Sequence, residues 1–228
     1  MIVTELSKGI KLYLLVGGKG ERLSSVTNGT PKPLVDIKGK PFINYVLDDL
    51  KGFDITLVCS DSTYDYFKNL DIDVFNEGDR AGTGGFLMKL GENVPDSFYV
   101  MNGDTYFTGD LNLDTDESTV FVAEELVTED VGYIRGRAGK VEEFVEKNSE
   151  ASGRELVSLG IYKFYKKDLD VPMRLPLSME YDILTGMEIS YKVLDTERFD
   201  IGTPERLERF KTWIPSTLLV QKEILAVD

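Results

Sequence analysis

The order of hydrophobic and polar positions divides the chain into two parts. Residues 10–16 are apolar almost throughout, as expected of a strand buried on both faces of a sheet. Short β-branched and aromatic runs then alternate with amphipathic segments, which is typical of βα units feeding a parallel sheet. Strands are predicted over residues 10–16, 55–59, 72–75 and 98–101, and helices over residues 62–70, 85–90 and from Pro41 to Gly52.

The pattern changes after residue 110. Apolar runs over residues 119–123, 131–135, 141–145 and 156–164 are separated by glycines and charged turns, so this part is predicted to be mixed or antiparallel. Helices over residues 180–187 and 204–213 flank a strand over residues 189–194. Without repeats or a linker, residues 1–228 are interpreted as one α/β domain: a Rossmann-like, mostly parallel central sheet flanked by helices, with a smaller antiparallel part.

The composition excludes several kinds of chemistry. The 228 residues include 26 Lys and Arg against 40 Asp and Glu, a formal net charge of −14, with no His and one Cys. So acidic a chain lacks the basic surface that nucleic acid requires, and we expect no nucleic-acid partner. Without His, and with a lone Cys, neither a Ser-His pair nor a zinc cluster is available. The chemistry must rest on Asp, Glu, Lys, Arg and the backbone.

The remaining apolar segments bear on location and partners. No run of about 18 apolar residues occurs, and residues 1–11 lack the features of a signal peptide, so we expect a cytoplasmic protein with no membrane partner. The apolar positions of the tail, residues 214–228, leave two alternatives open: packing on their own domain, or contact with a second copy in a homodimer.

A glycine-rich loop follows the first strand, with Gly17, Gly18 and Gly20 ahead of Arg22. Glycines allow the backbone to approach a ligand closely and to present N–H groups to anionic oxygens. The spacing lacks the third glycine of the dinucleotide fingerprint and the Gly-Lys-Ser/Thr end of a P-loop. On this loop alone, a phosphate site and a ligand-free turn are both open.

Lys32 lies between Pro31 and Pro33. Because proline on both sides favours an extended backbone, we expect this lysine to be held rather than free to swing. A fixed ammonium beside a glycine-rich loop suits a phosphate chain, whereas an isolated Pro-Lys-Pro would favour a solvated side chain.

Further motifs extend the pattern along residues 10–210. The segments are LVGGKGERL at 15–23, PKPL at 31–34, GKP at 39–41, GTGG at 82–85, MNGD at 101–104, EK at 146–147, SLGIY at 158–162 and FDIGTPE at 199–205. Together they resemble the signature of the sugar-1-phosphate nucleotidyltransferases, and their form is most similar to the heptose-1-phosphate and mannose-1-phosphate guanylyltransferases. Two positions depart from that pattern: Gly17 stands where Ala is commoner, and Asn148 where Pro is usual.

The resemblance implies an NTP-binding half over about residues 1–110 and a sugar-phosphate-binding half over about residues 111–213, followed by the tail. The implied nucleotide contacts are Gly17, Gly18, Gly20, Arg22, Glu77, Gly82, Thr83 and Gly84. The implied sugar-phosphate contacts are Glu146, Lys147, Gly160 and Glu180. Catalytic roles fall to Arg22, Lys32 and Asp104, and Asp104 with Asp200 would hold Mg²⁺.

The placement of Asp104 and Asp200 supports a metal site independently. Asp104 follows an apolar run and Asp200 lies in a glycine-terminated turn before a helix, and carboxylates at strand ends are where open α/β sheets bind ligands. Two hard oxygen ligands, completed by phosphate and water, suit Mg²⁺. Three Asp-x-Asp pairs, at positions 71 and 73, 114 and 116, and 168 and 170, are interpreted as solvated turns rather than as a glycosyltransferase metal motif.

These residues predict a reaction that needs no His. A sugar-1-phosphate oxygen would attack the α-phosphorus of an NTP in line and release pyrophosphate; with a second pKa of about 6, the phosphomonoester is already ionised near neutral pH. Residues 1–40 hold seven Lys and Arg against three Asp and Glu, so the acidic chain carries a local basic segment for these substrates. Two other classes stay open: a glycosyltransferase, which would release NDP, and a non-catalytic nucleotide-sensing subunit.

Overall fold

A central strand whose side chains point alternately into two hydrophobic cores organises the fold. The computed structural model describes residues 9–18, 20, 23, 27, 29–79, 81–127, 132–145, 153–172 and 174–215. In β1 (Lys11–Leu15), Leu12 and Leu14 pack into one hydrophobic core while Tyr13 packs into a second core on the other face. The strand is therefore buried on both faces, as its sequence predicts.

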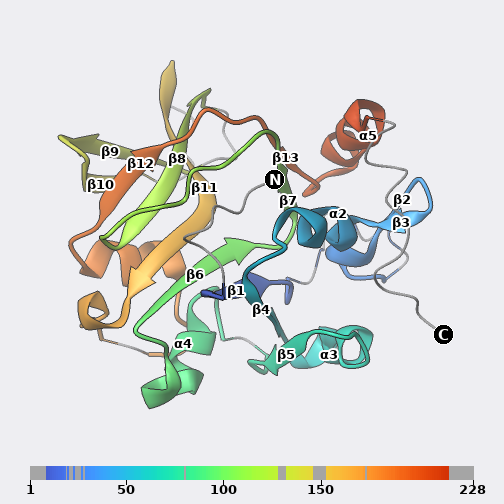
Figure 1. Cartoon of the computed structure of the whole chain (residues 1–228), viewed down its shortest axis with the longest axis horizontal. Helices are drawn as coiled ribbons and strands as arrows, with labels where there is room; N and C mark the ends of the chain where they lie inside the picture. Colours follow the sequence, from blue (N-terminus) through green and yellow to red (C-terminus); the bar gives the residue numbers. More distant parts are fainter. Residues whose placement is uncertain are drawn as a thin grey trace.

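The first part of the chain forms the parallel half of a nine-stranded sheet (Figure 1). β1 pairs in parallel with β4 (Asp54–Cys59) and β6 (Ser97–Asn102), and β4 pairs in parallel with β5 (Asp73–Asn76). The helices between these strands are α2 (Phe42–Asp49), α3 (Asp61–Phe67) and α4 (Gly85–Leu90), followed by the short η4 (Gly91–Asn93). The predicted strands and helices of this part are confirmed.

The second part continues the same sheet with mainly antiparallel pairs. It consists of β8 (Thr119–Leu126), β9 (Tyr133–Arg137), β10 (Lys140–Val145), β11 (Arg154–Tyr165) and β12 (Ser190–Val193). β11 pairs antiparallel with both β6 and β8, whereas β12 runs parallel to β8. The strand order is β5-β4-β1-β6-β11-β8-β12-β10-β9, so the mixed α/β sheet that the pattern predicts is confirmed.

Helices cover both faces of this sheet. On one face, α2 and α5 (Pro204–Trp213) pack together through Phe42 and Phe210, whose ring centroids lie 5.1 Å apart. On the other face, Phe86 of α4 packs against Tyr13 with ring centroids 5.0 Å apart. The carboxyl ends of the central strands lie between these helical layers. In open α/β sheets the loops at these ends bind the ligand.

One predicted helix is wrong, and several short elements escape the pattern. Instead of an α-helix over residues 180–187, the chain forms a π-helical turn, η6 (Met179–Ile183), and a 3-10 turn, η7 (Leu184–Gly186). The Asp182 carboxylate accepts a hydrogen bond from Ser178 N–H at 2.6 Å, a local bond that competes with regular α-helical pairing. The elements not predicted are β2 (Asp36–Ile37), β3 (Lys40–Pro41), β7 (Thr105–Phe107), β13 (Arg198–Asp200), η3 (Lys32–Leu34) and η5 (Lys166–Asp168).

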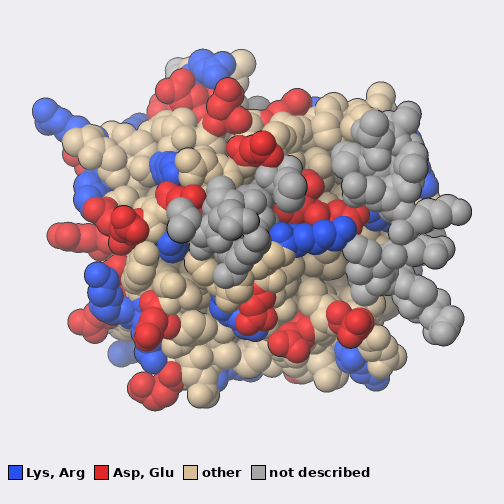
Figure 2. Space-filling model, viewed as in Figure 1, with Lys and Arg blue, Asp and Glu red and all other residues tan. Residues whose placement is uncertain are grey.

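One face of the molecule shows how its charges are distributed. On the face in Figure 2, basic side chains lie among acidic ones rather than in one continuous patch. None of the helices within the described residues is long and apolar enough to cross a membrane.

Candidate active site

Gly17 and Gly18 lie directly after β1, where the chain turns beside β4. A β-carbon on Gly17 would lie 2.9 Å from the backbone nitrogen of Ser60, and the Ser60 hydroxyl donates to the Gly17 carbonyl at 3.2 Å. Glycine at position 17 therefore has a local reason in this chain, because alanine would press on a neighbouring backbone. The loop stays close to the sheet and open to a ligand.

Lys32 reaches the end of β6 from outside the sheet. Its side chain passes over Gly20, whose φ is +62° and whose β-carbon would lie 2.9 Å from Lys32 Cγ. Lys32 Nζ lies 3.4 Å from Asp104 Oδ2. The expected extended backbone is wrong, because Lys32 begins the 3-10 turn η3, in which Val35 N–H donates to the Lys32 carbonyl. The turn nevertheless holds the ammonium beside the carboxylate.

Asp104, in the turn after β6, lies beside Asp200, which is the last residue of β13 rather than part of a turn as predicted. Gly103 N–H donates to the Leu15 carbonyl at 2.9 Å, which fixes the turn that presents Asp104. β7 and β13 pair antiparallel, and Ile201 N–H donates to the Asp104 carbonyl at 3.0 Å. The short strands that the sequence pattern missed thus bring the two predicted metal ligands to one site.

Two cavities meet at this site. The first, of about 410 Å³, is lined by Gly17, Gly18, Lys32, Glu77, Gly82 and Thr83 among others. The second, of about 460 Å³, is lined by Tyr162, Gly160, Glu180, Asp200, Arg198 and Arg206 among others. Asn102 and Asp104 belong to both linings. Two ligands could therefore be bound with their ends in contact.

The loop from Glu77 to Gly84 closes one side of the first cavity. Burial raises the pKa of Glu77 to about 7, against the opposing effects of Lys89 and of a hydrogen bond from Phe86 N–H. Gly82 has a φ of +82°, and a β-carbon there would lie 2.4 Å from the Leu177 carbonyl oxygen. The loop is thereby packed tightly against the segment that leads into the second cavity.

Thr83 and Glu180 link the two cavities. The Thr83 hydroxyl accepts from Met179 N–H at 2.8 Å and donates to Glu180 Oε2 at 3.3 Å. Tyr162, buried in the second core, donates its hydroxyl to Glu180 Oε1 at 3.2 Å. Residues that the resemblance divides between nucleotide and sugar phosphate thus share one hydrogen-bonded network.

Gly160 interrupts β11 at a β-bulge in the wall of the second cavity. Its φ is +67°, and the pairing of β11 with β8 shifts register between Ser158 and Ile161. The Asn102 side chain occupies the space that a side chain on Gly160 would fill. Asn102 carried no role in the sequence-based assignment, although it lies within the MNGD motif.

Three predicted site residues, Arg22, Glu146 and Lys147, lie outside the described residues, as do residues 216–228 of the tail. Of the other predicted residues, all but Gly20 and Gly84 line one or both cavities. Gly20 lies against the Lys32 side chain, and Gly84 N–H donates to the Leu177 carbonyl at 2.8 Å.

The structure also adds Asn102, Arg198 and Arg206, which had no assigned role. Asn102 lies within the MNGD motif, and the two arginines directly flank the FDIGTPE motif at 199–205.

Comparison with known proteins agrees with this geometry. Residues 12–113 match the family described as the MobA-like NTP transferase domain. The D-glycero-alpha-D-manno-heptose 1-phosphate guanylyltransferase of Campylobacter jejuni is 29% identical over 225 residues, covering 88% of this chain and 98% of that protein. The bifunctional protein GlmU of Methanocaldococcus jannaschii is 32% identical over 173 residues, and the match spans 72% of this chain but 42% of that longer protein.

Among solved structures, HddC from Yersinia pseudotuberculosis superposes with a TM-score of 0.72 and 30% identity, covering 89% of this chain and 98% of that one. An inositol-1-phosphate CTP transferase from T. maritima, at 16% identity and a TM-score of 0.66, shows the same fold. The chain belongs to the family of sugar-1-phosphate nucleotidyltransferases, the family whose motifs its sequence carries.

Proposed function

We propose that this chain transfers a guanylyl group from GTP to a sugar 1-phosphate, forming a GDP-sugar and pyrophosphate. The observation that carries the proposal is the meeting of two cavities at Asn102 and Asp104, with Lys32 beside Asp104. A nucleotidyl transfer needs the attacking oxygen of one substrate next to the α-phosphorus of the other. Two adjoining cavities with a shared wall provide that proximity.

Mg²⁺ is part of the proposal, and the residues present fit it. Asp104, in the turn before β7, and Asp200, at the end of β13, offer hard carboxylate oxygens from adjacent segments. Among the described residues no group of three or more His, Cys, Asp or Glu gathers into a complete metal site, so substrate phosphates and water would fill the remaining positions, as Mg²⁺ prefers. When bound, the ion would neutralise negative charge on the reacting phosphates.

The chain's own groups then have separate tasks. The backbone N–H groups of Gly17 to Gly20, with Arg22, would bind the triphosphate. The Lys32 ammonium would stabilise charge that develops on the α-phosphate and the leaving pyrophosphate. The attacking phosphate oxygen is already ionised, so no side chain has to remove a proton. Glu146, Lys147, Gly160 and Glu180 would contact the sugar phosphate.

The choice of GTP rests on the relatives. The C. jejuni protein is named as a guanylyltransferase, and one HddC structure, 29% identical with a TM-score of 0.70, is a complex with GMP-PN. In this chain the loop from Glu77 to Thr83 would contact the base, because its described residues line the first cavity.

The division into an NTP-binding half, about residues 1–110, and a sugar-phosphate-binding half, about residues 111–213, is part of the same proposal. The first cavity is lined by residues between 15 and 104, and the second by residues between 102 and 206. A cytoplasmic location also stays a proposal, and the single cysteine, a buried free thiol, agrees with it. Homodimer formation stays a prediction that light scattering of the purified protein would test.

One screen tests the proposed function. Pyrophosphate release is measured for each of GTP, ATP, UTP, CTP and dTTP crossed with a panel of sugar 1-phosphates and Mg²⁺, and products are identified by mass. We expect release with GTP and one sugar phosphate. Release with another NTP alone would overturn the assignment of GTP. No release with any pair would favour the nucleotide-sensing subunit, and NDP release from an NDP-sugar and an acceptor would favour a glycosyltransferase.

A further inference from the structure

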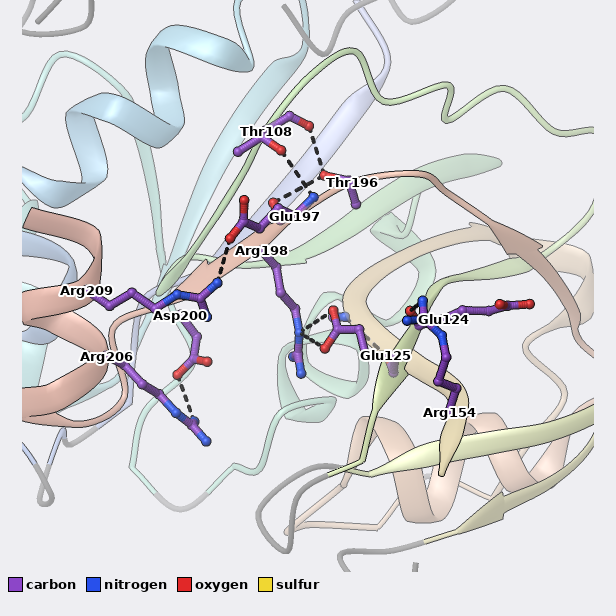
Figure 3. A network of polar contacts seen from close by, with 12 residues as sticks. Thr108, Glu124, Glu125, Arg154, Thr196, Glu197, Arg198, Asp200, Arg206 and Arg209 are labelled. Atoms are coloured by element: carbon purple, nitrogen blue, oxygen red, sulfur yellow. Dashed lines mark hydrogen bonds and ion pairs between the residues drawn. The ribbon is translucent and has the colours of Figure 1, made fainter. Parts of the chain in front are cut away.

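Two arginines line the second cavity. Arg198 lies in β13 and Arg206 in the first turn of α5, on either side of Asp200 (Figure 3). Of the described residues that line the second cavity, only these two carry a positive charge. Lys32, the only described cation in the lining of the first cavity, is absent from the second. The positive charges of the described lining residues are thus divided between the two cavities.

Arg198 is held in place by an acid outside the cavity. Its Nε lies 2.9 Å from both carboxylate oxygens of Glu125, and its side chain is 17% exposed. This ion pair engages the Nε edge of the guanidinium, so the two Nη groups are not part of it. Because Glu125 lies in β8, a different element from the one that carries Arg198, the ion pair fixes the plane of the guanidinium before any ligand binds.

Arg206 is held by the predicted metal ligand. Its Nη1 donates to Asp200 Oδ1 at 2.9 Å, and its backbone N–H donates to the Thr203 hydroxyl at 3.3 Å. Gly202 N–H donates to the same Asp200 oxygen at 3.1 Å. The guanidinium therefore lies where an anion could contact it and a metal on Asp200 together.

An ionised phosphate monoester suits this pair of donors. Planar guanidinium groups bind phosphate oxygens with paired, charge-assisted hydrogen bonds. The site lies beside Asp104 and Asp200, so a phosphate bound there would be next to the transferred α-phosphate. The other walls offer Tyr162 and Glu180, groups suited to sugar hydroxyls.

We propose that Arg198 and Arg206 bind the phosphate of the sugar 1-phosphate, with Glu125 orienting Arg198. The inference rests on the proposed function. It makes the second cavity the acceptor site through residues on β13 and α5. Arg209 supplies a matched control. It lies one turn further along α5 and pairs with Glu197 at 2.6 Å (Figure 3). It lines a third cavity, of about 580 Å³, but not the second.

The test compares Arg198→Gln, Arg206→Gln and Arg209→Gln with the wild-type chain, using GTP and the sugar 1-phosphate with the highest rate in the screen. Loss of one charged hydrogen bond corresponds to a change of about 10- to 100-fold. We expect the KM for the sugar phosphate to rise by about that factor in the first two variants, with the KM for GTP within about twofold. Arg209→Gln should leave both values unchanged.

The remaining arms separate phosphate binding from other roles. If Arg206 only positioned Asp200, Arg206→Gln would raise the Mg²⁺ requirement while the KM for the sugar phosphate stayed unchanged, which would overturn its part of the proposal. An unchanged KM in Arg198→Gln would overturn the other part. Should either variant fail to fold, as judged by its Tm, the Lys variant replaces it, with a smaller rise in the same KM expected. Glu125→Gln should also raise this KM, by less than Arg198→Gln. Absence of wild-type turnover refutes the proposed function itself, before any variant is compared.

Discussion

Gly160 and Asn102 lie so close together that no side chain fits between them: a β-carbon on Gly160 would lie 2.3 Å from Asn102 Nδ2. Gly160 also has a φ of +67°, a backbone conformation that residues with a side chain rarely adopt. Asn102 lines both cavities, so this contact lies at the boundary between them. The glycine of the SLGIY motif thus has a packing role, beyond any contact with the sugar.

We predict that Gly160→Ala displaces Asn102 and lowers kcat/KM by about 10- to 100-fold, because a shift near 1 Å in a reacting site costs rates of this order. Gly109→Ala is the matched control. Gly109 has a φ of +73°, but a β-carbon there would meet nothing within 4 Å. Both variants should lose about 1–2 kcal/mol of stability from the left-handed backbone, and only Gly160→Ala should lose activity. Equal activity of the two would contradict the packing role.

The ion pair between Lys32 and Asp104 leads to a second prediction. Lys32→Ala and Asp104→Asn should each lower the rate of pyrophosphate release by about 10²–10³, the usual cost of losing one group that stabilises transition-state charge. Lys40→Ala is the control for lysine removal. The Lys40 and Lys32 side chains are both 15% exposed and ion-paired, but Lys40 pairs with Asp48 and lines neither cavity. It should keep near-wild-type turnover, and wild-type turnover in Lys32→Ala would remove Lys32 from the mechanism.

Glu77 leads to a prediction about pH. The folded-state pKa of about 7 lies above the ordinary value of 4.5, so the folded protein binds this proton more tightly than the unfolded chain does. This contribution to stability is fully present below about pH 4.5 and is lost as the pH rises through about 7. Glu77→Gln removes it, and the difference in unfolding free energy between variant and wild type should therefore move in favour of the variant between pH 5 and pH 8. Urea unfolding at several pH values measures this difference, and a constant difference would show that Glu77 does not titrate in this range.

Strong periodicity explains why most of the fold could be predicted from the sequence. The bounds of α4 and α5 agree with prediction at both ends, because each pattern of apolar positions ends at a glycine or begins at a proline. The helix predicted over residues 180–187 is wrong because its acidic side chains hydrogen bond locally, as Asp182 does with Ser178. β7 and β13 are three residues each, too short for an alternating pattern to be recognised.

The site was predictable where glycine and proline mark the backbone, and not where only topology brings charges together. Gly17, Lys32 and Asp104 lie in motifs with distinctive spacing. Arg198 and Arg206 directly flank the FDIGTPE motif, but they are two among 26 Lys and Arg, and the motif alone does not show that both side chains face one cavity. They share a cavity only because β13 pairs with β7 and α5 follows directly, a consequence of tertiary structure.

An aromatic cluster around Phe210 supports α5. Phe210 is fully buried, with its ring centroid 5.1 Å from that of Phe42, 5.4 Å from Tyr106 and 5.8 Å from Phe199. Phe210→Ala should cost about 3–5 kcal/mol of stability, as for other large aromatic deletions. Because the same helix carries Arg206, the folded fraction should also show a raised KM for the sugar phosphate.

Phe67→Ala is the control for this effect. Phe67 is equally buried, but it lies in α3 and lines neither cavity. We expect a loss of stability in the same range, measured by urea unfolding, with kcat and KM of the folded protein close to wild type at a temperature where both variants are folded. If the two variants lost stability equally and neither changed the KM, the packing of α5 would have no influence on the acceptor site. A change confined to Phe210→Ala would tie the aromatic core to the position of Arg206.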